Sequence, residues 1–112
     1  APEFAVFQAL NRLGFRDRFE FQSSKFGGRA TRGGLVLDFW IPSLGVALLI
    51  SGEYWHYERA GQVAIDLIQR QQLESSGITA VFIDEDDALQ NADFFVSDAL
   101  RGIDHSKLTR GF

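Results

Sequence analysis

The stretch that decides the fold is LDFWIPSLGVALLISGEYWHYER, residues 37–59. Two apolar runs, residues 37–41 and 46–51, flank the turn-forming sequence PSLG. Short apolar runs on either side of a tight turn are typical of a β-hairpin. The second run has no polar residue before Ser51, which favours a central strand covered on both faces. The hairpin therefore carries one carboxylate, Asp38, inside a strand that is otherwise suited to burial.

Asp38 is the first candidate for a functional group. Pairing of residues 35–41 with 46–52 brings it close to Leu49 and Ile50. A lone carboxylate inside a buried strand is costly, so it is normally hydrogen-bonded, ion-paired or bound to a metal ion. The alternative is a strand-end aspartate that caps a turn. Because Asp38 lies in the middle of the apolar run, a functional role is favoured over a turn cap.

The segments before the hairpin predict a helix and a strand. Residues 2–13 have a proline at the first helical position and a glycine directly after their end, which indicates a helix. The apolar stripe of this helix is predicted to consist of Phe4, Phe7, Leu10 and Leu13. Residues 18–24, RFEFQSS, alternate phenylalanine with polar residues, which is typical of a half-exposed strand.

The segments after the hairpin predict a crossover unit and a last helix. Apolar residues spaced by four indicate a helix at about residues 59–76, and a strand, ITAVFID, follows at 78–84. Strand, helix and strand with such short links imply parallel strands. Asn91 is placed to cap the last helix, and Gly102 lies beyond its end. We therefore expect one α/β domain over residues 1–112, a mixed central sheet flanked by helices, in the order α-β-β-β-α-β-α.

The composition bounds the class of protein. A chain of 112 residues with 46% hydrophobic residues and 11 phenylalanines folds as one domain with an aromatic core. The absence of cysteine excludes disulfides and thiolate metal sites. No apolar run approaches the roughly 20 residues of a membrane span, and no leader is visible, so we expect a cytoplasmic or phage-encoded intracellular protein. The absence of methionine, even at position 1, predicts a piece of a longer chain.

The charge is distributed unevenly along the chain. The formal net charge of −4 argues against a nucleic-acid partner, but residues 1–37 hold six basic against three acidic residues. Three of these bases, Lys25, Arg29 and Arg32, lie in the glycine-rich stretch KFGGRATRGG. Such a loop suits close approach to a phosphate backbone, which positions a protein on DNA without reading sequence. An ordinary flexible hairpin tip is the alternative.

Three stretches carry a resemblance to a known family: GGLVLDFWIP, VALLISGEYWHYER and DLIQRQQLESSGITAVFID. They resemble the restriction-endonuclease-like, or PD-(D/E)XK, nuclease superfamily, and within it the very-short-patch repair endonucleases and related small domains. The likeness runs from Pro2 to Asp84, and its more specific elements are Asp-Phe and Gly-x-x-Trp-His. It implies a restriction-endonuclease-like core and a DNA endonuclease that uses Mg²⁺ or Mn²⁺, in repair, restriction or phage DNA processing.

The resemblance also assigns roles to residues. Asp38 matches the metal-binding aspartate, Glu3 the acid on the first helix, and His56 the histidine that acts as general base. The chain departs from the family at Leu49-Ile50-Ser51, where most relatives carry Glu-x-Asp or Glu-x-Lys. By analogy with the very-short-patch enzymes, the Ile50 carbonyl would then help to hold the metal. Glu53, nominally on the same strand face as Ser51, is the substitute acid.

Other interpretations of these residues remain open. Glu3 also suits the first turn of a helix, where a carboxylate favours the dipole, and Glu53 also suits a solvated hairpin edge. Arg70 is a candidate for binding phosphate, or for an ion pair with Asp66 four residues earlier. The acidic run from Asp84 is expected to be solvated. The alternative function is a catalytically degenerate module for DNA binding or assembly, as a homo-oligomer or in a larger complex.

Overall fold

The computed structural model describes residues 2–23, 37–52 and 60–107. It contains a four-stranded mixed sheet and three helices, so the predicted α/β class is confirmed. The elements are α1 (Pro2–Arg12), β1 (Glu20–Ser23), β2 (Leu37–Ile41), β3 (Val46–Ser51), α2 (Ala60–Ser75), β4 (Thr79–Asp84) and α3 (Glu85–Leu100).

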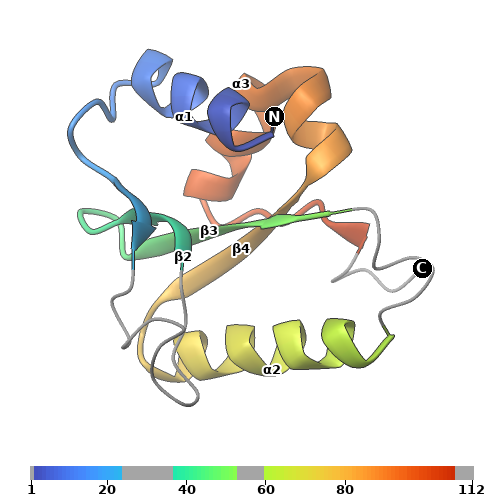
Figure 1. The fold of residues 1–112 in the computed structure, drawn as a ribbon. Coiled ribbons are helices and arrows are strands. Elements are labelled where there is room, and N and C mark those ends of the chain that lie inside the picture. The colour runs from blue at the N-terminus through green and yellow to red at the C-terminus, as the bar shows by residue number, and fades with distance from the viewer. Residues whose placement is uncertain (1, 24–36, 53–59, 108–112) are drawn as a thin grey trace.

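The sheet has the strand order β1-β2-β3-β4. The first three strands are antiparallel, and β4 is parallel to β3, as the strand–helix–strand pattern predicted. Figure 1 shows α1 and α3 together on one face of the sheet and α2 on the other. The turn at residues 42–45 closes the β2–β3 hairpin with Gly45 at φ 65°, a conformation that favours glycine. No helix among the described residues is long and apolar enough to span a membrane.

The two faces of the sheet have separate cores because side chains alternate along each strand. Phe39 and Ile41 of β2 are completely buried with Leu10 of α1 in the larger core, on the side of α1 and α3. Trp40, between them in sequence, belongs to the smaller core with Leu73 of α2. The central strand β3 is therefore covered on both faces, as its unbroken apolar sequence predicted.

The predicted apolar stripe of α1 is wrong in most of its members. Phe4 and Phe7 are 61% and 39% exposed, and Leu13, just after the helix, is exposed as well. The helix instead buries Pro2, Val6, Ala9 and Leu10. Both sets fit the helical period of 3.6 residues, and the smaller side chains allow α1 to pack closely on the sheet and α3. An aromatic stripe is left facing outward.

Helix α3 begins earlier than predicted and is kinked. Asn91 has non-helical angles, φ −156° and ψ 77°, and its Oδ1 accepts a hydrogen bond of 3.2 Å from the amide of Phe94. The predicted cap at Asn91 is therefore present, and it divides α3 into a first helical segment from Glu85 and a second one. Gly102, at φ 83°, follows the helix end. The amides of Gly102 and Ile103 close that end by bonding to carbonyls of the last turn.

Loss of the internal cap is expected to weaken α3. The variant Asn91→Ala removes the acceptor for the amide of Phe94 and should lower the free energy of unfolding by about 1 kcal/mol. Urea unfolding followed by circular dichroism measures the change. The control is Gln90→Ala, an exposed neighbour, for which we expect a change within about 0.5 kcal/mol. Equal stability of the two variants would show that the cap contributes nothing.

Candidate functional site

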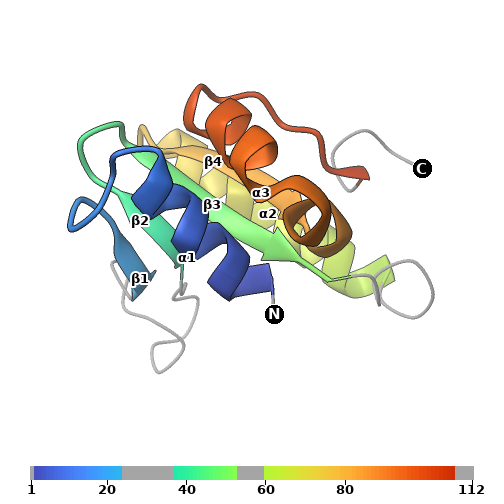
Figure 2. The same ribbon diagram turned by 90° about the horizontal axis from the view of Figure 1, so that it is seen from above.

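The candidate site lies at one edge of the sheet, where β3 and β4 end and β2 begins. Ser51 and Asp84, the last residues of β3 and β4, are register partners, and both are buried. Since β2 runs antiparallel to β3, its early residue Asp38 lies at this edge too. Figures 1 and 2 show that α1 and α3 also begin here. The topology thus gathers strand ends and helix starts that come from distant parts of the sequence.

Asp38 is half-buried and takes part in the hairpin. Its Oδ2 accepts a hydrogen bond of 2.8 Å from the amide of Ile50. Within the described residues the β2–β3 ladder ends at the pair Phe39 and Leu48, although β3 continues to Ser51. The carboxylate therefore satisfies a backbone donor of β3 beyond the end of the ladder. This contact joins Asp38 to the amide of Ile50, whereas the predicted ligand is the carbonyl of that residue, and it gives the carboxylate a structural role.

Glu3 lies at the same edge, in the first turn of α1, and is half-buried. Alternation along β2 puts Asp38 on the face of Trp40, which packs with α2. Helix α1 covers the opposite face. An ion shared by Asp38 and Glu3 would therefore have to sit at the rim, beyond the ends of the strands. Glu3 also suits the dipole of α1, and its metal-binding role stays a prediction.

Five of the predicted site residues lie outside the described residues. They are His56, Glu53, Lys25, Arg29 and Arg32. The first two follow β3 in sequence, and the other three follow β1. The predicted general base, substitute acid and DNA-contacting loop are therefore untested.

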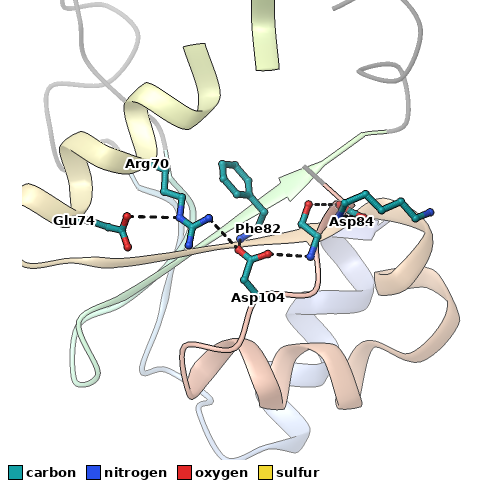
Figure 3. A network of polar contacts seen from close by, with 7 residues as sticks. Arg70, Glu74, Phe82, Asp84 and Asp104 are labelled. Carbon is teal, nitrogen blue, oxygen red and sulfur yellow. Dashed lines mark hydrogen bonds and ion pairs between the residues drawn. The ribbon is translucent and has the colours of Figure 1, made fainter. Parts of the chain in front are cut away.

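Arg70 is partly buried and lies between two carboxylates (Figure 3). Its guanidinium lies 3.7 Å from Glu74 Oε1 and 3.7 Å from Asp104 Oδ2, and 5.8 Å from the ring centre of Phe82. The side chain of Asp66, the expected ion-pair partner of Arg70, lies outside the described part of the chain. The Nε atom is buried and donates no hydrogen bond to any residue that the structure describes. Binding of phosphate by Arg70 would compete with these two carboxylates.

A second group of contacts fastens the C-terminal strap, residues 103–107, to β4. Asp84 Oδ1 accepts a hydrogen bond of 2.6 Å from Ser106 Oγ, and its Oδ2 accepts one of 3.0 Å from the amide of Lys107. Asp104 Oδ2 accepts from the amide of Phe82 at 2.9 Å, and its Oδ1 from the amide of Ser106. Carboxylates of the strap and of β4 thus accept hydrogen bonds from three backbone amides and one hydroxyl along the edge strand β4.

Sequence reasoning missed this strap. Its sequence, IDHSK, has no apolar periodicity. A segment that is held by buried polar contacts does not need a periodic apolar pattern, so the sequence gives no signal for it. The expectation that the acidic run from Asp84 is solvated is wrong for its first member, because Asp84 is only 3% exposed. Asp86 and Asp87 are half-buried in the first turn of α3.

Three carboxylates at this edge form a group that could hold a cation. One oxygen each of Asp84, Asp86 and Asp87 lies within 4.8 Å of the others. Burial, followed by the charges of Asp86 and Asp84, raises the pKa of Asp87. Hard cations prefer such oxygen ligands, but both oxygens of Asp84 already accept hydrogen bonds, and Lys107 Nζ lies 3.5 Å from Asp86. The group is therefore better explained as the anchor of the strap.

The pKa of Asp98 is lowered, first by its hydrogen bond with His105 and then by that with Arg101. A carboxylate with a lowered pKa stabilises the fold above its ordinary pKa, and this contribution disappears as the pH falls through the lowered value. The stability difference between wild type and Asp98→Asn should therefore be present at pH 7 and shrink below about pH 4. Urea unfolding at both pH values measures it. Asp87→Asn is the control, because a raised pKa predicts that its difference changes in the opposite direction.

Comparison with known proteins gives no relatives. No family model matches the chain, and neither curated proteins nor solved structures give a significant match.

Proposed function

We propose that the domain is a DNA endonuclease of the PD-(D/E)XK type that uses Mg²⁺ or Mn²⁺ to hydrolyse phosphodiester bonds. The proposal includes a restriction-endonuclease-like core and an intracellular role in repair, restriction or phage DNA processing. The observation that carries it is the contact of 2.8 Å between the Asp38 carboxylate and the amide of Ile50, at the edge where the β2–β3 ladder ends. This contact supports the proposal because it holds the Asp38 carboxylate against the backbone of Ile50, the residue whose carbonyl is the proposed second ligand.

The proposed chemistry needs few protein ligands. Magnesium is commonly bound by one or two carboxylates with water and substrate phosphate completing its shell. Asp38 would supply one carboxylate and Glu3 or Glu53 the second, with the Ile50 carbonyl as a further oxygen. The metal would lower the pKa of a bound water and offset charge on the phosphate. His56 would take the proton from the attacking water, because its ordinary pKa lies near 6.5.

The hydrolysis proceeds by attack of the water oxygen on phosphorus. One bond between phosphorus and a sugar oxygen breaks, and that oxygen leaves with a proton. Conversion of supercoiled plasmid to relaxed or linear forms in Mg²⁺ or Mn²⁺, and its absence in a chelator, tests the proposal. The decisive variant is Asp38→Asn, argued in the Discussion.

A second candidate is a non-catalytic module for DNA binding or assembly, as a homo-oligomer or within a larger complex. It is favoured by Leu49-Ile50-Ser51, which leaves β3 without the acid of most relatives. The engagement of Arg70 by Glu74 and Asp104 points the same way. This candidate predicts DNA binding that weakens with salt, and no cleavage with either metal. The plasmid assay separates the two functions.

A further inference from the structure

The strand β4 forms one border of the sheet within the described residues. The amide of Thr79 bonds to the carbonyl of Gly45, on the side of β3. Backbone groups alternate along a strand, so the amides of Ala80, Phe82 and Asp84 point to the other side, away from β3. An outer strand with such groups is a template to which another strand can add.

The sequence of β4 makes this border prone to pairing. Residues 78–83, ITAVFI, carry no charge and no proline, and all of them except Ala80 are β-branched or aromatic. Short segments of this composition stack strand on strand when their edges are exposed. Ile78 and residues 80–83 are buried, so charged side chains on β4 itself would disrupt the two cores. Protection of this border therefore has to come from another segment.

The strap, residues 103–107, lies along this border in place of a further strand. Asp104 lies beside Phe82 of β4 (Figure 3), and its Oδ2 accepts a hydrogen bond of 2.9 Å from the Phe82 amide, the middle one of the three outward amides. Its Oδ1 accepts from the amide of Ser106 at 2.9 Å, which fixes the carboxylate within the strap. A charge thus stands where an added strand would need a carbonyl. Natural edge strands are blocked by inward-pointing charges of this kind.

Three elements hold the strap in this position. On β4, Asp84 accepts hydrogen bonds from two groups of the strap. On α3, Asp98 Oδ2 lies 2.8 Å from His105 Nε2. On α2, Arg70 Nη1 lies 3.7 Å from the Asp104 carboxylate. These contacts converge on a segment that buries few apolar side chains, and their common effect is to keep Asp104 against β4.

We propose that the strap is an edge guard, which keeps β4 from pairing with the β4 strand of a second copy of this chain. A second copy is the occupant because ITAVFI has no charge with which to select a different partner, and identical apolar strands complement each other. Pairing about a two-fold axis joins the two β4 strands in antiparallel orientation and uses the same outward amides on both copies. The edge guard goes beyond the proposed nuclease function and requires neither metal nor DNA.

The test is hydrogen–deuterium exchange of the Phe82 amide in Asp104→Ala, followed by NMR at several protein concentrations. At low concentration this amide should exchange about ten-fold faster than in the wild type, because it has lost its acceptor. As the concentration rises, the exchange should slow again, and sedimentation velocity should show a shift from monomer toward dimer. In the wild type the exchange of Phe82 should not depend on concentration.

The matched control is Val6→Ala, which loosens the larger core beneath α1 and leaves the contacts of the strap in place. It should show no dependence on concentration. A second strap variant, His105→Ala, loses the contact with Asp98 but keeps Asp104, and should associate in the same way at higher concentrations. Exchange of Phe82 that does not depend on concentration in either strap variant would overturn the proposal. Association that leaves the Phe82 amide unprotected, or equal association of Val6→Ala, would overturn it as well.

Discussion

Asp38→Asn is expected to reduce metal-dependent plasmid nicking by at least about 100-fold while leaving the fold intact. The asparagine Oδ1 can still accept the hydrogen bond that the amide of Ile50 donates to Asp38. The substitution removes the negative charge that holds the cation, and a metal contributes several kcal/mol to the transition state of phosphoryl hydrolysis. Initial rates of loss of supercoiled plasmid in Mn²⁺ measure the effect.

Two other variants separate catalysis from stability. Asp38→Ala removes the acceptor as well as the charge and should cost about 1 to 3 kcal/mol, because the amide of Ile50 loses its partner. Asp93→Asn is the matched control, since it changes an exposed carboxylate that binds Arg12 on the outside of α1 and α3. It should nick at the wild-type rate. If Asp38→Asn nicks as fast as wild type, Asp38 is a structural residue and the binding or assembly module becomes the better proposal.

The strand elements could be predicted because hydrophobic pattern and turn chemistry agree there. The runs on either side of PSLG predicted the pairing that brings Asp38 to Ile50, and the short links predicted the parallel strand β4. The Asn91 cap and the Gly102 stop were readable because each needs one residue type at one backbone position. These are local rules, and each acts within a few residues of the sequence.

The face of α1 could not be predicted from periodicity alone. Phe4 and Phe7, three residues apart, fit the helical period as well as Val6 and Leu10, four residues apart, and hydrophobicity favours the phenylalanines. The choice depends on how closely the helix must approach β2 and α3, which is a tertiary property. The prediction for α1 failed because the larger side chains, Phe4 and Phe7, were assumed to lie in the core.

The polar contacts at the sheet edge escaped prediction for a different reason. A carboxylate that accepts hydrogen bonds from a distant backbone has no period and no nearby partner in the sequence. Asp84 was therefore expected to be solvated, whereas it accepts hydrogen bonds from the strap beside β4. The candidate metal site shares this property, since Asp38 and Glu3 are 35 positions apart in the numbering. The metal site was assigned from the family resemblance alone, and the Asp38 variants test that assignment.

Asp84→Ala is expected to give the largest loss of stability, about 2 to 4 kcal/mol in the free energy of unfolding. The side chain is 3% exposed and accepts from Ser106 Oγ and from the amide of Lys107. Alanine would leave the hydroxyl of the fully buried Ser106 and the partly buried amide of Lys107 without these acceptors. Urea unfolding measures the loss, and limited proteolysis after Lys107 should accelerate because the strap is released from β4.

The control for this experiment is Asp86→Ala, two residues along. Asp86 is also acidic and also contacts Lys107, through a Nζ–Oδ2 distance of 3.5 Å, but its side chain is 45% exposed. An exposed pair of this kind contributes less than about 1 kcal/mol, so its removal should change neither stability nor proteolysis appreciably. Similar losses in both variants would mean that the negative charge at the start of α3 matters more than the strap. A loss confined to Asp84→Ala assigns the stability to two hydrogen bonds that tie residues 103–107 to the edge of the sheet.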